Sequence, residues 1–389
     1  MATDTYSILT MPLRTEPWQE HIIEKRFAII EHLKNQLIAM ELRKLKNVER
    51  TKEYRDIINA IDAAPKNKRN ELYKKRQALL RKEKLSEFAF KDDIAKMQKK
   101  FSEHIYSHIA HRAASEVWNA FDKYLFHGGK AVHYHKKGTL DSVACQEAGG
   151  GMRYKDNVFT WGGGKSPHQI SISIQVVSPR NDYECEMLKK QIKYMRIVRK
   201  WMKNRYKYYL QFTLAEPPVS KNRPLGHGRV GIDIGPQTVA VVSSGKAMLL
   251  ELADRVNRNH QRKLILQRQM DNSRRRTNPG NFNPDGTLKI VRGQRLHWVQ
   301  SRHYRQLAAQ VRELERKNAA IRKYQHTCLA NVILSLGDDI YIERMNFSGL
   351  QHRAKETKKD EKGRFLKKKR FGKSLAEVNK IDDDTVSLQ

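Results

Sequence analysis

Hydrophobic residues recur with the period of an α-helix over the first third of the chain. From Pro17 to about Phe126 apolar positions return every three or four residues, as in Phe27, Ile30, Leu33, Leu37 and Met40. Pro17 suits the first turn of a helix, and Pro65 interrupts the pattern. We therefore predict a helical lobe over residues 17–126, preceded by one strand over residues 4–11.

The pattern changes at Gly128, where glycines cluster and apolar residues begin to alternate with polar ones. The stretches AVHYH, HQISISIQVV and YKYYLQFTL are typical of half-buried antiparallel strands. We predict that residues 1–16 and 127–215 form a small β-barrel, in which MLKKQIKYMRIVRKWMKNR is a helical or strand-bearing insertion. The stretch over 216–228 contains Pro and Gly and is predicted to be a linker.

The last part, residues 229–389, alternates strands with long helices. Three strands are predicted in GRVGIDIG, QTVAVVSS and KAMLLELA, followed by a basic helix around NRNHQRKLILQRQM and a polar loop, NSRRRTNPGNFNPDG. A second long helix is expected from about Gln294 to Leu336, and the strand DIYIERM follows it. The fold class predicted for the whole chain is therefore α+β with several domains.

The net charge of the chain indicates which kind of molecule the protein binds. The 389 residues include 76 Lys and Arg against 42 Asp and Glu, a net charge of +34. Such an excess favours a polyanion, because each neutralised phosphate releases counterions, and nucleic acid is preferred here to a membrane surface. No apolar run is long enough for a transmembrane helix and no signal peptide is evident, so we expect a soluble, cytoplasmic protein without a membrane partner.

Cysteine spacing argues against a structural metal of the zinc type. The three cysteines are Cys145, Cys185 and Cys328, and none has a second cysteine at CxxC spacing. We expect neither a zinc site within this chain nor a disulfide framework.

Two acidic residues on short apolar strands are the candidate catalytic residues. Asp233 lies in VGIDIG, where Val230, Ile232 and Ile234 alternate with two glycines and the carboxylate, and Glu343 ends the strand IYIE. Three strands, a helix and a further strand follow the order of the RNase H-like fold. In that fold carboxylates on neighbouring strands hold two Mg²⁺ ions about 4 Å apart. We expect Asp233 and Glu343 to be ligands of a two-metal Mg²⁺ site.

These segments resemble a known family. The stretches KYYLQFTL, GIDIGPQTVAVVS and IYIERMNFSGL, with the basic stretch ending KRFGKS, are similar to the transposon-associated TnpB (OrfB) family and to the compact type V CRISPR effectors. The resemblance implies a helical recognition lobe, a β-barrel wedge domain and a RuvC/RNase H-like nuclease domain. It also implies an RNA-guided, Mg²⁺-dependent DNA endonuclease whose partners are a guide RNA and double-stranded target DNA. By the same resemblance, Asp233 and Glu343 are the first and second RuvC carboxylates.

The resemblance weakens at the end of the sequence. A family member continues with a helix, a four-cysteine zinc module and a third aspartate on a strand, whereas this sequence ends in EVNKIDDDTVSLQ. The acidic cluster Asp382, Asp383 and Asp384 lacks a strand pattern around it. We therefore expect a truncated, incomplete RuvC-like domain, whose third metal ligand is not identified.

Three basic clusters are candidate nucleic-acid contacts. The first lies on a predicted helix, the second in the polar loop and the third near the end of the chain; they are Lys74, Lys75 and Arg76; Arg274, Arg275 and Arg276; and Lys367, Lys368, Lys369 and Arg370. Single clusters of this kind are also common in solvated loops.

Three other functions fit parts of the sequence. An RNA-guided DNA-binding protein without cleavage is consistent with the missing third carboxylate. An ATP-dependent phosphotransferase is a second alternative, because the motif GIDIGPQT resembles the phosphate loop of sugar kinases and actin-like ATPases, although no second DxG segment follows residue 300. A strand-transferring transposase needs a third carboxylate after Glu343, which the sequence does not offer.

Overall fold

The computed structural model describes the chain in two compact units, residues 1–221 and 222–389, which are treated separately below. Within them the described residues are 6–65, 69–162, 168–219, 225–235, 237–257, 259–290 and 293–343. The fold is mixed, with helices and two β-sheets. The predicted boundaries of the recognition lobe, wedge, linker and nuclease domain remain predictions.

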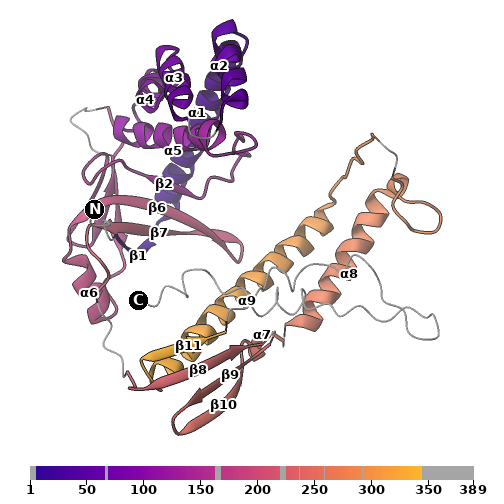
Figure 1. Ribbon diagram of the computed structural model, residues 1–389. Helices are drawn as coiled ribbons and strands as arrows, with labels where there is room; N and C mark the ends of the chain where they lie inside the picture. Colours follow the sequence, from indigo (N-terminus) through magenta and orange to yellow (C-terminus); the bar gives the residue numbers. More distant parts are fainter. Residues whose placement is uncertain are drawn as a thin grey trace. The chain divides into compact units, whose positions relative to one another are not determined.

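Long helices form the first part of unit 1 (Figure 1). They are α1 (Pro17–Glu49), α2 (Lys52–Ala63), α3 (Arg69–Lys82), α4 (Glu87–Gln98) and α5 (Ser107–Phe126). Pro17 occupies the first turn of α1 as predicted, and Thr51 caps α2 by accepting a hydrogen bond from the Tyr54 amide. The apolar stripe that predicted α1 is buried, and Phe90 of α4 packs edge to face on Phe121 of α5.

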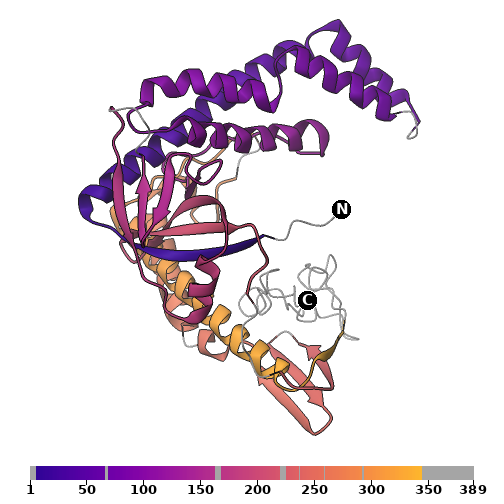
Figure 2. The same ribbon diagram turned by 90° about the vertical axis from the view of Figure 1, so that its left-hand side faces the viewer.

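A curled sheet of seven strands completes unit 1 (Figures 1 and 2). The strands are β1 (Ser7–Arg14), β2 (Ser142–Ala144), β3 (Met152–Lys155), β4 (Val158–Trp161), β5 (Ile172–Val176), β6 (Ile192–Met202) and β7 (Arg205–Leu214), with α6 (Asp182–Leu188) before β6. Their order is β2-β6-β7-β1-β5-β4-β3, and β1 pairs antiparallel with both β7 and β5. The edge strands β2 and β3 are not paired with each other among the described residues, so the described sheet curls without closing as a barrel.

The predicted strand AVHYH is wrong. Residues 131–135 form no strand, and at His135 a side chain takes the place of a neighbouring strand as the backbone's partner. The Asn35 amide donates to the His135 carbonyl at 2.9 Å and accepts from the His135 N–H at 2.8 Å. Alternation of polar and apolar residues predicts strand here, but it does not reveal a side chain 100 residues away that replaces the partner strand.

Unit 2 combines a four-stranded sheet with a helical hairpin (Figure 1). The elements are β8 (Arg229–Ile234), β9 (Thr238–Ser243), β10 (Lys246–Glu251), α7 (Asp254–Asn257), α8 (His260–Thr277), α9 (Arg302–Leu334) and β11 (Asp339–Ile342). The strand order is β10-β9-β8-β11, antiparallel except for the parallel pair β8 and β11. Ile321, Leu329 and Ile333 of α9 pack on the apolar face of this sheet.

Two predicted boundaries in unit 2 are wrong. The second long helix begins at Arg302 rather than near Gln294, because the Ser301 hydroxyl accepts a hydrogen bond from the Tyr304 amide at 3.0 Å and caps the helix there. The arginine triplet 274–276 lies in the last turn of α8, not in a loop. Asp271 supports this turn by accepting hydrogen bonds from Arg274 and Arg275, three and four residues later.

None of the helices within the described ranges has a stretch both apolar and long enough to traverse a bilayer.

Candidate functional site

Strand β8 has one buried and one open face, and Asp233 lies on the open one. Val230 is fully buried and Ile232 is 8% exposed, whereas Gly231 and Asp233 are exposed. The strand is therefore buried on one face only, and the carboxylate lies on its exposed face. Successive side chains of a strand point to opposite faces, so the face carrying Asp233 is the one not covered by α9.

Parallel pairing brings Glu343 to the same face as Asp233. In the register of β11 and β8, Tyr341 pairs with Gly231 and Ile342 with Ile232. The Glu343 amide then donates to the Ile232 carbonyl at 3.4 Å, so the register continues one residue past the strand end. Residues at equal register on parallel strands share a face, and neighbouring strands lie about 4.8 Å apart. The backbone positions of the two predicted ligands are therefore adjacent.

Close glycine packing fixes this register at the start of both strands. The Gly226 amide donates to the Leu334 carbonyl at the end of α9, and a Cβ on Gly226 would lie 2.4 Å from the Ser335 carbonyl oxygen. A Cβ on Gly337 would lie 2.3 Å from the Gly228 carbonyl oxygen. Only glycine allows such an approach, so the chain leaving α9 is held directly beside the beginning of β8.

Asp338 adds a polar clamp at the same place. Its carboxylate accepts from the Gly228 amide at 2.9 Å and lies 3.0 Å from the His227 ring nitrogen Nδ1. The hydrogen bond from Gly228, and then that from His227, lower the pKa of Asp338. The clamp and the glycine contacts together explain why β11 enters the sheet parallel to β8 with Asp233 and Glu343 at equal register.

Two small residues lie beside Asp233 on the open face. Ala240 of β9 pairs with Asp233, and Gly231 lies two residues before it on the same face. Val242 and Tyr341 pair with Gly231 from either side and are each 54% exposed. The face around Asp233 is therefore exposed, and the Tyr341 ring lies beside Gly231 on the same face. Tyr341 was not singled out from the sequence, although the alternation in IYIE places it on the face of Glu343.

The chemistry of the two side chains fits a hard divalent cation. Carboxylate oxygens are the ligands Mg²⁺ prefers, and Mg²⁺ commonly takes one or two protein carboxylates together with water and phosphate oxygens. Within the described ranges, no three His, Cys, Asp or Glu side chains gather as a metal site. The role of Asp233 and Glu343 as metal ligands therefore stays a prediction, and Asp382, Asp383 and Asp384 lie outside the described residues.

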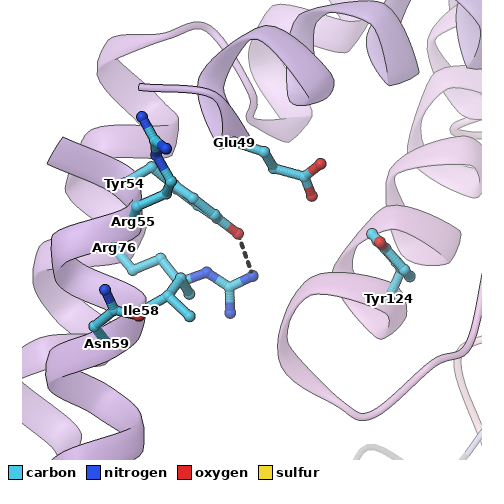
Figure 3. Close-up of a pocket in the computed structure, with 7 residues that line it drawn as sticks. All are labelled: Glu49, Tyr54, Arg55, Ile58, Asn59, Arg76 and Tyr124. Atoms are coloured by element: carbon cyan, nitrogen blue, oxygen red, sulfur yellow. Dashed lines mark hydrogen bonds between the residues drawn. The ribbon is translucent and has the colours of Figure 1, made fainter. Parts of the chain in front are cut away.

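The first basic cluster divides into two exposed lysines and one engaged arginine, Arg76, whose hydrogen bond to Tyr54 is drawn in Figure 3. Lys74 and Lys75 are exposed on α3. The Arg76 guanidinium donates to the Tyr54 hydroxyl and to the Leu125 carbonyl, each at 2.8 Å, and thereby joins α3 to α2 and to the end of α5. It also lies 5.5 Å from the centroids of the Tyr54 and Phe126 rings. Arg76 therefore has a structural role that its position in a basic run does not reveal.

The second cluster is divided in the same way. Arg274 lies over the Trp298 ring at 4.8 Å, and Arg275 lies over the Phe282 ring at 4.8 Å and donates to the Gly286 carbonyl at 2.7 Å. Both arginines hold the loop after α8 against the helix. Arg276 is exposed and faces no acidic partner among the described residues. The third cluster, Lys367, Lys368, Lys369 and Arg370, lies outside the described residues.

Comparison with known proteins gives distant structural likeness only. No protein-family model and no curated protein matches the sequence. A Cas12f1 protein, solved by cryo-electron microscopy with sgRNA and target DNA, is similar with a TM-score of 0.45 and 10% identity over 87% of this chain and 81% of that chain. A CRISPR-Cas12f ternary complex is similar with a TM-score of 0.30 and 13% identity over 92% of this chain and 69% of that chain. With TM-scores below 0.5, neither likeness supports a statement about this chain. Both neighbours are Cas12f proteins, and the narrower resemblance to TnpB stays a prediction.

Proposed function

We propose that this protein is an RNA-guided DNA endonuclease of the RuvC type, which depends on Mg²⁺. The observation that carries the proposal is the equal register of Asp233 and Glu343 on adjacent parallel strands. Two carboxylates separated by 110 residues of sequence reach the same point of an open sheet face, in a chain of net charge +34. Both residues are exposed, so their carboxylates are accessible to a metal ion and to a phosphodiester.

Asp233 and Glu343 are the residues that would hold Mg²⁺ in this proposal. Bound Mg²⁺ lowers the pKa of water, and a metal pair stabilises the attacking and leaving oxygens of a phosphodiester. The chain's own contribution is the placement of the carboxylates on rigid strands and the bare backbone at Gly231, which leaves room for a phosphodiester beside Asp233. Tyr341 offers a ring on the same face against which a base can stack.

The proposed partners are a guide RNA and double-stranded target DNA. The positive charge accounts for binding to either nucleic acid without regard to sequence. The guide RNA and the association with a transposon rest on the resemblance of GIDIGPQTVAVVS and IYIERMNFSGL to the TnpB family.

The test is a plasmid-cleavage assay with co-expressed flanking RNA, run with Mg²⁺ on the wild type and Asp233→Ala. We expect the variant to lose cleavage more than about 100-fold, since even outer-shell partners of metal ligands contribute 10- to 100-fold. Glu251→Ala, an exposed carboxylate on β10, is the matched control and should cut like the wild type. Equal cutting by the wild type and Asp233→Ala would remove Asp233 from the mechanism.

One observation favours a second candidate, an RNA-guided DNA-binding protein that does not cut. No group of three possible metal ligands is found among the described residues, and two ligands bind a metal pair less tightly than three. Binding of RNA and target DNA with no cleavage by the wild type at any Mg²⁺ concentration would select this function.

A further inference from the structure

A pocket in unit 1 lies far in sequence from the two carboxylates and has the chemistry of a nucleotide site. Its volume is about 580 Å³, within the usual range for small-molecule sites. Helices α1 and α5 form two walls and the segment after α5 forms the third. We call it the Lys34 pocket, lined among others by Lys34, Ile38, Val117, Ala120, Lys123 and Lys130.

The third wall is held in place by side chains of α1. Asn35 makes the two hydrogen bonds to the His135 backbone described above. Glu31, 7% exposed, accepts hydrogen bonds from the amides of Gly138, Thr139 and Leu140 at 3.0, 3.1 and 3.3 Å. The turn at the start of the wall is equally tight, because a Cβ on Gly129 would lie 2.9 Å from the Lys123 carbonyl oxygen. The third wall is therefore held by contacts within the protein and needs no ligand to form.

Positive charge gathers at this pocket. The Lys34 side chain is 5% exposed and pairs with Glu116, as a buried ammonium requires. Glu116 also lies 3.7 Å from Arg112 and 3.9 Å from Arg196, so one carboxylate faces three cations. Lys123 and Lys130 line the pocket without an acidic partner among the described residues. Burial, and then the charge of Lys34, lower the pKa of His135 on the wall.

Beside these charged groups and the polar His133 and His135, the pocket has an apolar side. Val117 is 3% exposed and Ile38 is 2% exposed, and Ala120 and the Tyr124 ring complete that side. A site with cations at one side and an apolar wall at the other suits a ligand with an anionic group attached to a flat, largely apolar ring. A nucleotide has this form, since its phosphate binds ammonium groups and its base packs on apolar and aromatic side chains.

We propose that the Lys34 pocket binds one unstacked nucleotide of a single strand, with the base against Ile38 and Val117 and the phosphate between Lys123 and Lys130. A paired base would have to leave its duplex to enter, at a cost of a few kcal/mol, whereas a single-stranded base enters freely. The inference rests on the proposed function only in taking nucleic acid as the ligand, and it is independent of Asp233 and Glu343.

The test measures affinity for fluorescent 12-nucleotide strands at fixed salt without Mg²⁺. Ala120→Phe places a bulky side chain at an exposed residue of the pocket lining without changing charge. The exposed neighbour Asn119→Phe, which does not line the pocket, is the matched control. We expect Ala120→Phe to weaken single-strand binding about tenfold, within the range of one stacked base, and to leave binding of the duplex of equal length within about twofold. Asn119→Phe should bind both like the wild type.

A second pair of variants tests the phosphate. Lys123→Ala with Lys130→Ala should weaken single strands more than duplexes, whereas Lys99→Ala with Lys100→Ala, exposed lysines away from the pocket, should weaken both equally. Comparing RNA with DNA strands shows whether the bound nucleotide carries ribose or deoxyribose. Comparing strands with and without a 5′-phosphate shows whether it is an internal or a terminal nucleotide. Equal affinities of Ala120→Phe and Asn119→Phe for single strands, with unchanged melting temperatures, would overturn the proposal. Because these affinities are measured without Mg²⁺ and without cleavage, failure of the nuclease proposal is seen separately.

Discussion

Gly231 pairs with Tyr341 across the parallel strands β8 and β11, two residues before Asp233 and Glu343. Neither the backbone conformation nor the packing at position 231 requires a glycine. Its φ is not positive, and a Cβ placed on it meets only the Val242 carbonyl oxygen, at 4.0 Å. A glycine inside a strand lowers stability unless something must approach its backbone, and the proposed phosphodiester is such a ligand.

Substitution at Gly231 should separate activity from stability. We expect Gly231→Ala and then Gly231→Val to leave the melting temperature equal or higher, because both residues favour a strand more than glycine does. Cleavage should fall in the same order, by about 100-fold for valine, the scale of a 1 Å misplacement of substrate. Gly245→Ala, in the turn between β9 and β10 with open space around its Cβ, is the control. Full activity of Gly231→Val would exclude close approach of the substrate at this point.

The arginines at the end of α8 should differ in what they support. Arg276→Ala should reduce the slope of log affinity for duplex DNA against log salt by about 0.9, the value of one phosphate contact, without change in melting temperature. Arg274→Ala should instead lower the melting temperature, because it removes the Trp298 contact and the hydrogen bond to Asp271. Salt titrations and thermal melts of both variants check this. A lower slope for Arg274→Ala at unchanged stability would contradict the division of roles.

Glu41 should make unit 1 less stable as pH rises. Burial raises the pKa of Glu41 to about 7, although a hydrogen bond from Lys44 opposes the shift. In the unfolded chain a glutamate titrates near about 4.3. The stabilisation by protonated Glu41 is therefore complete below about pH 4 and is lost as pH rises through about 7.

Replacing Glu41 by glutamine should remove this dependence. At pH 8 we expect Glu41→Gln to melt at least about 2 °C above the wild type, and at pH 4 the two should melt together. Glu53→Gln, exposed on α2, is the control and should follow the wild type at both values. A stability difference that grows toward low pH would show that Glu41 is charged in the folded state.

The sequence predicts most elements because their patterns are local. The alternation of Val230 and Ile232 with Gly231 and Asp233 describes β8 as it is found, and the stripe through Phe27 and Leu33 describes α1. Errors arise where one side chain decides the outcome. Ser301 sets the start of α9 and Asn35 replaces a strand partner for His135, and periodicity does not detect either contact.

The pairing of Asp233 with Glu343 is predictable only in part. The order of strands and helices suggests neighbouring strands, but the register depends on contacts of Gly226 and Gly337 with backbone atoms distant in sequence. The contacts of Arg76, Arg274 and Arg275 could not be predicted either. A basic run has the same sequence pattern whether its side chains contact phosphate or aromatic rings. The Lys34 pocket has no sequence motif, because α1, α5 and the segment after α5 each contribute only part of it.

The central position of β1 has a consequence for synthesis of the protein. Its partner strands end at Val176 and Leu214, so its backbone hydrogen bonds are made with residues translated some 160 to 200 positions later. Contacts of such long range slow folding, whereas the intervening helices can form from local contacts. On the ribosome, the helices should therefore fold first. Most of β1 should stay unpaired until the hairpin of β6 and β7 has left the exit tunnel, because only Leu13 and Arg14 pair with the earlier strand β5.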